Sequence, residues 1–456
     1  MRTKLALAFA AGLAGLVLFN EVEYAQSAGS FARDPGVRTG AAGAGNPLPL
    51  ITARELAFFN AGRDDFNEVE AAKDGLGPRM NLDSCGGCHS QPAAGGSSPA
   101  VNPQVAFASA LGAANRVPSF IRQNGPVREV RFVRNPDGSA DGGVHSLFTI
   151  AGRGDAPGCS LAQPDFEGQL ANRNAIFRIP TPVFGSGLIE AIPDRAILAN
   201  QAATASLRSS LGIRGRANVV SPFQTISGQT NNNGNDGTIA RFGWKAQNKS
   251  LLIFSGEAYN VEMGISNALF PTEREENPAC QFAASPNDFF DTAADTPLDA
   301  MSAADKFATF MRLLAPPTPS ATEPGGSLSI GRGKLFFAAA GCNGCHTPSL
   351  RTGNAAIVAL RNQPVDLYSD LLVHDMGNGL ADGVSQGQAG PREFRTAPLW
   401  GLGQRIFFLH DGRTSDLLVA IRQHASTNSE ANQVVARFEQ LREDQKQDLL
   451  NFLRSL

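Results

Sequence analysis

The sequence predicts a mainly α-helical protein with two domains of one kind, the first of which carries a long insert containing short β-strands. Two observations lead to this prediction. A Cys-x-x-Cys-His motif occurs twice, as Cys85-Gly-Gly-Cys88-His89 and as Cys342-Asn-Gly-Cys345-His346. Each motif follows a segment with the start signals or apolar spacing of a helix, whereas residues from about 91 to 240 are broken by many turn signals.

The Cys-x-x-Cys-His motif is the attachment signature of a c-type haem. Two thiols three positions apart reach the two vinyl groups of one porphyrin, and the adjacent His ligates the iron. A zinc knuckle, a redox Cys-x-x-Cys or a structural disulfide is the alternative. Zinc sites, however, combine such a motif with a second one or with a His pair, and neither copy is followed by such a partner. We therefore expect two covalently bound haem c groups in two cytochrome c-like domains.

Length and charge narrow the class of protein further. At 456 residues, with 42% hydrophobic residues, the chain can bury a sizeable core in two or three domains. Its formal net charge of −3 gives no strong attraction to nucleic acid or to acidic membrane surfaces. We expect no nucleic-acid partner.

The N-terminus has the features of an export signal. Met1-Arg-Thr-Lys4 precedes an uncharged run from Leu5 to Phe19, and small residues near Ala25 to Gly29 suit cleavage. We interpret residues 1–28 as a signal peptide and expect a periplasmic protein with no membrane span after cleavage. An uncleaved anchor is the alternative, although the run is short for a span. Residues 29–50, rich in Gly, Ala and Pro, are predicted to be a disordered leader.

Residues 51–314 are predicted to form the N-terminal haem domain. Thr52-Ala-Arg-Glu55 is a capping box that opens its first helix. The insert occupies about residues 91–240, where Val127–Val133 and Val144–Ala151 have the alternation of strands and Arg195–Leu211 is predicted to be helical.

Residues 315–326, rich in Pro and Gly, are the predicted linker. The C-terminal cytochrome c domain is expected over residues 327–456, and its last helix near Arg442–Leu456 has an apolar face.

His424 is the predicted sixth ligand of the second haem, opposite His346. It lies in the segment Ser415–Ser426, where Leu417, Ile421 and His424 fall on one helical face. A hydrogen-bonded core His is the alternative reading. His410 could ligate instead, or hold a propionate together with Arg395 and Arg413. For His374 and His145 a structural role is favoured.

The region after Trp244 supplies candidates for the first haem. A likely helix there places Ser255, Tyr259 and Glu262 on one face. A carboxylate beside an open ferric iron can take the proton from the near oxygen of a bound peroxide and deliver one to the leaving oxygen. Trp244, Tyr259 and Glu262 are therefore the candidate catalytic residues, although most such Glu side chains are simply solvated.

Cys159 and Cys280 remain after the haem cysteines. In an oxidising compartment one disulfide between them is the simplest expectation, although the sequence does not give their distance. Thiol chemistry at this pair is the alternative.

Taken together, these motifs resemble those of a known family, the dihaem c-type oxidoreductases or putative peroxidases, formerly called thiol oxidoreductases. The matching stretches cover most of the mature chain in a family-specific order. They are Gly125–Glu129, Phe184–Glu190, Arg241–Ala246, Asn260–Gly264, His374–Gly377, Arg395–Trp400 and Leu409–Arg413.

A more distant similarity relates the chain to bacterial dihaem cytochrome c peroxidases, to their tryptophylquinone-forming relative and to latex-cleaving dihaem oxygenases. It implies that Trp244 lies between the haems and that Glu262, followed by Met263, faces the peroxidatic iron, with two fewer residues between Trp and Glu than in the peroxidases. It also implies that His424 occupies the position of the sixth haem ligand, which is Met or Tyr in those proteins. The peroxidases also bind calcium, for which Thr396, Pro398 and the loop from Asn231 to Asp236 are the candidates here.

The resemblance implies an enzyme that reduces hydrogen peroxide to water. Electrons from a small cytochrome c or cupredoxin would enter at the second haem (His346, His424), pass near Trp244, and be used at the first haem (His89), with Glu262 as acid and base. One alternative is a dihaem electron carrier in which Met263 or Tyr259 ligates the first iron. Another is an oxygenase that binds dioxygen at the first haem.

Overall fold

The structure is a computed structural model that describes residues 31–80, 82–112, 116–140, 144–145, 150–219, 225–226, 229–230 and 239–456. The predicted signal peptide and the candidate calcium loop from Asn231 to Asp236 lie outside the described residues, as do residues 146–149 of the second predicted strand. Ala32–Leu456 forms one compact unit. Within it the fold is mixed, with 36% helix and 9% strand, and the strands form small sheets. The predicted division into two domains at residues 315–326 remains a prediction.

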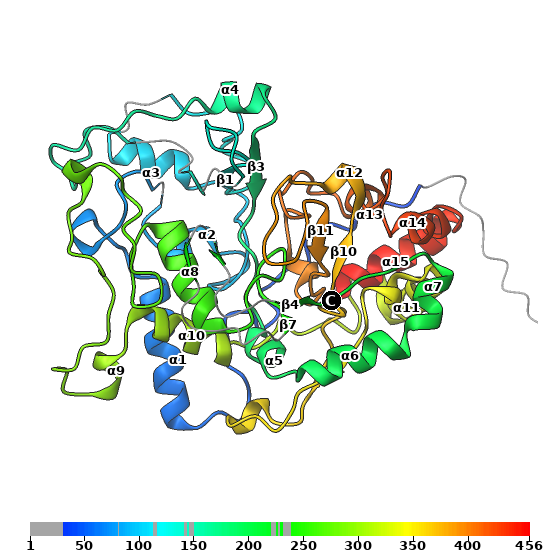
Figure 1. Ribbon diagram of the computed structural model, residues 1–456. Coiled ribbons are helices and arrows are strands. Elements are labelled where there is room, and N and C mark those ends of the chain that lie inside the picture. Colours follow the sequence, from blue (N-terminus) through cyan, green and yellow to red (C-terminus); the bar gives the residue numbers. More distant parts are fainter. Residues whose placement is uncertain are drawn as a thin grey trace, which may run out of the picture. The chain divides into compact units, whose positions relative to one another are not determined.

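Helices account for most of the regular structure (Figure 1). In chain order they are α1 (Ala53–Phe66), α2 (Cys85–Cys88), α3 (Gln104–Ala110), α4 (Phe166–Ala171), α5 (Ser186–Glu190), α6 (Asp194–Ala203), α7 (Ala205–Ser210), α8 (Leu251–Met263), α9 (Pro297–Ala300), α10 (Ala303–Leu313), α11 (Gly326–Ala340), α12 (Gly377–Leu380), α13 (Leu417–Gln423), α14 (Asn432–Glu439) and α15 (Glu443–Ser455).

The strands are short and pair antiparallel. They are β1 (Glu129–Phe132), β2 (Val144–His145), β3 (Ala175–Arg178), β4 (Asn218–Val219), β5 (Thr225–Ile226), β6 (Gln229–Thr230), β7 (Ile239–Ala240), β8 (Leu350–Arg351), β9 (Pro364–Val365), β10 (Val373–Asp375) and β11 (Glu393–Arg395). The largest sheet has the order β2-β1-β3, with Val130 opposite both His145 and Phe177. The strands predicted near residues 127–133 and 144–151 are thus present as β1 and β2.

Local sequence signals account for several helices. The Thr52 hydroxyl accepts from the Glu55 amide at 3.2 Å, and the Glu55 carboxylate accepts from the Thr52 amide at 2.7 Å, so the predicted capping box opens α1. The predicted helix Arg195–Leu211 is present as α6 and α7, and the predicted final helix as α15.

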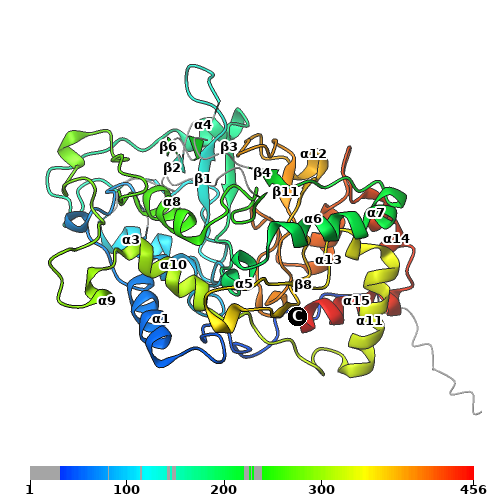
Figure 2. The same cartoon turned by 60° about the horizontal axis from the view of Figure 1, so that its bottom comes forward.

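The helix α1 packs along α10, and α8 packs on the other side of α10 (Figures 1 and 2). Gly62 makes this close approach possible, because a Cβ there would lie 2.3 Å from the Lys306 carbonyl oxygen. One turn further on, Phe66 contacts Phe310 of α10 with ring centroids 5.1 Å apart.

The pair α11 and α15 is built in the same way. A Cβ on Gly333 would lie 2.0 Å from the Asp448 carbonyl oxygen, so the two helices cross at this glycine. One turn further on, Phe337 contacts Phe452 of α15 at 5.5 Å between centroids. Each Cys-x-x-Cys-His motif therefore follows a helix whose Gly and Phe, four residues apart, pack against a later helix with a Phe of its own.

Residues 32–50 are ordered, which corrects the prediction of a disordered leader. The Asp34 carboxylate pairs with Arg454 of α15 at 2.6 Å, and the Arg38 amide donates to the Gly403 carbonyl at 2.7 Å. Further along, the Leu48 amide donates to the Leu313 carbonyl at 2.7 Å, at the end of α10. The Gly- and Pro-rich composition was misleading because the partners that order this segment lie hundreds of residues away.

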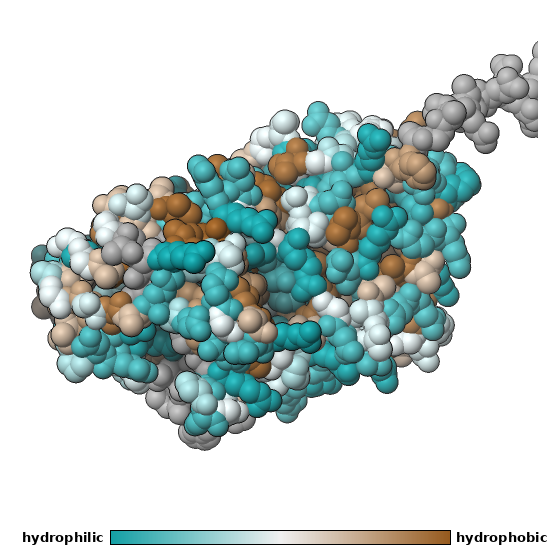
Figure 3. All heavy atoms as spheres, turned by 90° about the horizontal axis from the view of Figure 1, so that it is seen from above, coloured by the Kyte–Doolittle hydropathy of each residue, from teal (hydrophilic) through white to brown (hydrophobic). Residues whose placement is uncertain are grey.

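The face of the protein drawn in Figure 3 is mostly hydrophilic, and its hydrophobic residues are scattered in small groups. Among the described residues, no helix combines the length and the apolar character that crossing a bilayer requires.

Candidate functional site

The first Cys-x-x-Cys-His motif forms α2 and its end. The Ser84 hydroxyl caps the helix by accepting from the Gly87 amide at 3.2 Å. Cys85, Cys88 and His89 line a cavity of about 180 Å³, far more than the roughly 10–15 Å³ that one water needs. None of the four motif cysteines forms a disulfide.

His89 is fixed in one orientation. Its Nδ1 lies 3.0 Å from the Gly96 carbonyl oxygen, and a carbonyl can only accept, so Nδ1 carries the proton. Burial lowers the pKa of His89 to about 4, which keeps the ring neutral. Nε2 is then left with a free lone pair, as a metal-ligating His requires. Phe66 supports the ring edge-on at 5.9 Å between centroids.

The helix α8 forms the opposing polar wall of this first cavity. Ser255, Tyr259, Glu262 and Met263 all line it, so the residues predicted to share one helical face do so. The side chain of Glu262 is surrounded by many protein atoms. It still has accessible surface, because it borders the cavity. Burial raises the pKa of Glu262 to about 8, and the negative charges of Glu129 and Glu257 add to the effect.

The hydroxyl of Tyr259 points to a second carboxylate. It donates to Glu70 Oε1 at 2.7 Å, and the ring of Tyr259 packs edge-on against Phe307 at 5.0 Å. Burial raises the pKa of Tyr259 above its ordinary value, so the phenol keeps its proton at neutral pH. Burial also raises the pKa of Glu70 to about 7.

The second motif borders a larger cavity of about 220 Å³. Cys342, Cys345, His346 and His424 line it together. His346 Nδ1 lies 2.9 Å from the Tyr368 carbonyl oxygen, and His424 Nδ1 lies 2.8 Å from the Ala420 carbonyl oxygen. Both rings are thereby left with Nε2 as the free nitrogen.

The helix α13 positions His424. Asp416 caps this helix by accepting from the Val419 amide at 2.9 Å, and His424 is its C-cap residue. Leu417, Ile421 and His424 all line the second cavity, as expected from their shared face. Burial lowers the pKa of His346 to about 4, and the charge of His424 lowers it further, so the two rings are near neighbours.

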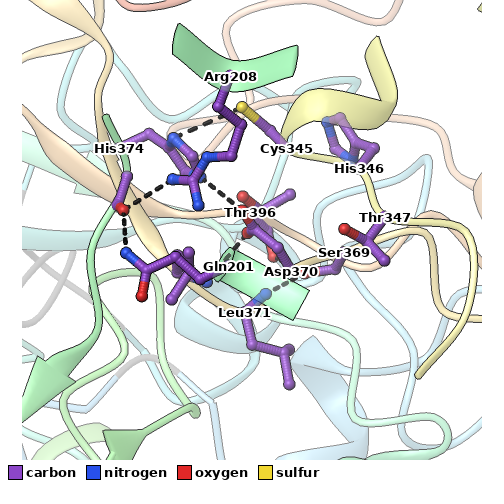
Figure 4. Close-up of polar contacts among 12 residues, drawn as sticks. Gln201, Arg208, Cys345, His346, Thr347, Ser369, Asp370, Leu371, His374 and Thr396 are labelled. Carbon is purple, nitrogen blue, oxygen red and sulfur yellow. Dashed lines mark hydrogen bonds and ion pairs between the residues drawn. The ribbon is translucent and has the colours of Figure 1, made fainter. Parts of the chain in front are cut away.

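The remaining His residues at the second cavity are held differently. His374 lies 3.0 Å from Asp370 through Nε2 and 3.0 Å from Glu430 through Nδ1, and Figure 4 shows it beside Asp370 and Cys345. Both ring nitrogens are thus engaged by carboxylates, which agrees with a structural role. His410 lies flat against Phe394, with centroids 4.3 Å apart. The side chain of His145 is outside what the structure describes.

Trp244 connects the two cavities. Among the described residues, it alone lines both the first and the second cavity, and it also lines a smaller one of about 40 Å³. Its indole Nε1 donates to the Ile179 carbonyl at 3.1 Å, and its carbonyl accepts from the Arg395 amide at 2.9 Å. The side chain is therefore fixed at the wall that the cavities share.

Comparison with known proteins gives one match that covers most of the chain. Residues 129–456 match the model of the family described as "Di-haem oxidoreductase, putative peroxidase". The chain belongs to this family of di-haem oxidoreductases. The resemblance inferred from the motifs is confirmed. No protein of curated function matches the chain.

One solved structure is similar over part of its length. It is hydrazine synthase of Kuenenia stuttgartiensis, pressurised with xenon, with 16% identity over 35% of this chain and 56% of that chain, and a TM-score of 0.23. A score this low supports no inference about this di-haem oxidoreductase.

The residues of both cavities fit the haem groups that the family name implies. Arg395 and Arg405 line the second cavity, and no carboxylate among the described residues pairs with either guanidinium. Burial lowers the pKa of each to about 10, and Arg405 Nε has no hydrogen-bond partner. Unpaired buried charges of this kind cost several kcal/mol, roughly, unless a counter-ion such as a haem propionate is present. Arg413, the other Arg predicted to hold a propionate, pairs with Asp411 at 2.7 Å instead.

Sequence reasoning missed several polar groups of the first cavity. Arg178 Nε, Gln104 Oε1 and Gln247 Oε1 are buried there without a partner among the described residues, and Glu129 faces the same space. Glu129 belongs to one of the stretches that resemble the family, which was the available signal. The others come together only in the folded chain.

Cys159 and Cys280 form a disulfide, as expected from their number. Both are buried. Within the described ranges, no group of three or more His, Cys, Asp or Glu could hold a metal ion by itself. Calcium at Thr396 and Pro398 stays a prediction.

Proposed function

We propose that the protein is a periplasmic dihaem c-type oxidoreductase that reduces hydrogen peroxide at the first cavity with electrons received at the second. The family supports an oxidoreductase with haem. The observation that carries the finer proposal is the asymmetry of the cavities. The carboxyl group of Glu262 borders the cavity of the first motif, whereas a second His borders that of the other.

Two cytochrome c-like units with covalent haem are part of this proposal. The repeated packing supports it, since Gly62, Phe66 and Phe310 in one half correspond to Gly333, Phe337 and Phe452 in the other. The cysteines would bind the porphyrins at Cys85 and Cys88, and at Cys342 and Cys345. His89 and His346 would ligate the irons.

Haem held by His89 would supply electron exchange with the substrate. Glu262 would take the proton from one oxygen of the peroxide and give it to the other, which would leave as water when the O–O bond breaks with electrons received at the second cavity. A carboxyl group whose pKa lies near neutral pH is suited to both steps. The indole of Trp244 fills the wall through which electrons must travel between the two centres.

At the second cavity, His346 and His424 present free Nε2 atoms to one space. Two imidazoles close an iron to other ligands, so this side suits electron entry and not substrate binding. We infer that the donor is a small redox protein, a cytochrome c or a cupredoxin.

The proposal is tested by electron paramagnetic resonance together with turnover. We expect one high-spin and one low-spin ferric signal in equal amounts. If both signals are low-spin in the ferric protein, we expect a high-spin signal from the first centre alone after reduction of the second centre, because low-spin ferrous iron gives no signal. Glu262→Gln is expected to lose about 10²- to 10⁴-fold in peroxide turnover. In the wild-type protein, kcat/KM should rise with pH towards the Glu262 pKa of about 8, because the base form must accept the first proton.

Glu68→Gln is the matched control, since Glu68 is an exposed carboxylate outside the cavity. Full turnover in Glu262→Gln would contradict the acid–base role. A signal of the first centre that stays low-spin after reduction of the second centre would favour the electron carrier, and a stable ferrous–dioxygen spectrum would favour the oxygenase.

A further inference from the structure

If hydrogen peroxide is the substrate, as proposed above, the first cavity has a proton requirement that Glu262 cannot meet. Reduction of one H₂O₂ to two H₂O breaks the O–O bond and consumes two electrons and two protons. Glu262 moves the peroxide's own proton from one oxygen to the other, which leaves the number of protons unchanged. The electrons come from the redox-protein donor. The two protons must reach the cavity from solvent in every turnover.

Tyr259 is the side chain that connects the cavity with a carboxylate nearer to solvent. It lines the first cavity one helical turn before Glu262, and its hydroxyl donates to Glu70 Oε1 at 2.7 Å. Both Tyr259 and Glu70 also lie close enough to the Cys85 thiol to act on it electrostatically, which places the pair at the motif end of the cavity.

Glu70 lies where this contact meets the surface. It is half-buried, and the three residues before it, 67–69, are exposed. Its amide donates to the Asp83 carbonyl at 2.8 Å, which fixes the backbone beside the motif. Glu70 does not line the cavity, and Tyr259 contacts both the cavity and Glu70.

We propose that Glu70 and Tyr259 form the path by which protons enter the first cavity. Glu70 takes a proton from solvent and donates it to the phenol oxygen, while the phenol releases its own proton into the cavity. The phenol is neutral before and after the transfer. In the resting arrangement Tyr259 donates to ionised Glu70, so protonation of Glu70 reverses the direction of this hydrogen bond and prepares the next transfer.

The charges around Glu70 suit this task. The pKa of Glu70 is raised to about 7. Burial is the largest cause, the hydrogen bond from Tyr259 opposes it, and the carboxylates of Glu68 and Asp74 on its own segment and of Asp288 on a neighbouring loop add to the rise. Lys73 is engaged by Asp74 at 3.1 Å. Glu70 can therefore gain and lose a proton near neutral pH, whereas an ordinary Glu would remain ionised.

The test compares Tyr259→Phe, Glu70→Gln and Glu70→Asp with the wild-type holoprotein. Tyr259→Phe and Glu70→Gln are expected to lower kcat roughly tenfold or more, to leave KM for peroxide nearly unchanged and to increase the solvent deuterium isotope effect on kcat. Glu70→Asp keeps a carboxyl and should recover part of the rate. Glu68→Gln removes a neighbouring charge that raises the pKa of Glu70 and does not touch the hydrogen bond, so it should shift the pH dependence of kcat to lower pH and leave the maximal kcat unchanged.

An infrared titration of the ferric protein gives a readout that does not depend on turnover. A protonated-carboxyl band that titrates near pH 7 should disappear in Glu70→Gln and shift in Tyr259→Phe. Wild-type kcat and isotope effect in both variants would overturn the path and leave the peroxidase proposal standing. Absence of turnover in the wild-type protein would overturn both, and absence of the titrating band would overturn the path alone.

Discussion

At the scale of single residues, the chemistry of each cavity depends on which ring nitrogen of each His side chain is left without a hydrogen bond. In His89, His346 and His424 a backbone carbonyl engages Nδ1, so each ring has Nε2 as its free nitrogen. His374 has the opposite arrangement, with both nitrogens on carboxylates. The first arrangement leaves a ring nitrogen available for the ligand role proposed above, whereas the second does not.

This contrast predicts the behaviour of His424 variants. Replacing His424 by Met should raise the reduction potential of the second centre by on the order of 0.1 V, because His/Met ligation favours the ferrous state over His/His ligation. The first centre should keep its potential. The measurement is a spectroelectrochemical titration of the holoprotein.

His410→Met is the control for that substitution. His410 lines the same cavity but stacks flat on Phe394 at 4.3 Å, so its removal should leave the axial ligands and the low-spin spectrum unchanged. If His410→Met shifts the potential while His424→Met does not, the assignment of the two residues is reversed.

At the scale of elements, one packing device recurs in both halves. A helix before each motif carries Gly and Phe four residues apart, and each Gly lies against the backbone of a later helix. The spacing Gly62 to Phe66 and Gly333 to Phe337 was visible in the sequence. It was overlooked because the distance from Phe to the motif differs so much between the copies.

Two glycines within α11 provide a stability test of the crossing between α11 and α15. Gly333→Ala should lower the free energy of unfolding by about 1–3 kcal/mol, because a Cβ there meets the Asp448 carbonyl and the helices must move apart. Gly331→Ala lies in the same helix with nothing within 4 Å, so it should be neutral or gain up to about 1 kcal/mol. The measurement is thermal unfolding of the two variant holoproteins. Equal melting temperatures for Gly333→Ala and Gly331→Ala would exclude a tight crossing of α11 and α15.

Local patterns were sufficient for part of the fold and of the site. The capping box of α1, the position of α13 and the helical face of Ser255, Tyr259 and Glu262 follow from spacing and propensity alone. What sequence could not give are contacts between distant segments. The unpaired Arg405 and the hydrogen bond from Tyr259 to Glu70 each require residues from several elements to meet, and the place of Trp244 was implied only by the resemblance.

At the scale of the whole molecule, the buried disulfide closes a loop over residues 159–280. Cys159 and Cys280 are 121 residues apart, and a loop of this length can be worth roughly 2–5 kcal/mol through the unfolded state. The cysteines pack with Ala72, Ala156 and Leu161 and do not line either large cavity. We expect a structural function for this bond.

Replacement of both cysteines by Ser should therefore lower the melting temperature and leave peroxide turnover at neutral pH unchanged below that temperature. A matched comparison is the wild-type protein after alkylation without reduction, which leaves the disulfide intact. Loss of turnover in the folded double variant would favour thiol chemistry at this pair.

The segment of residues 32–50 has a consequence for the order of events during synthesis. Asp34 and Arg454 are 420 residues apart, and both Cys-x-x-Cys-His motifs lie between them. Because a ribosome makes Asp34 long before Arg454, this pair cannot form until both motifs between them have been synthesised. The motif cysteines are thus present before Asp34 finds the partner that fixes its segment.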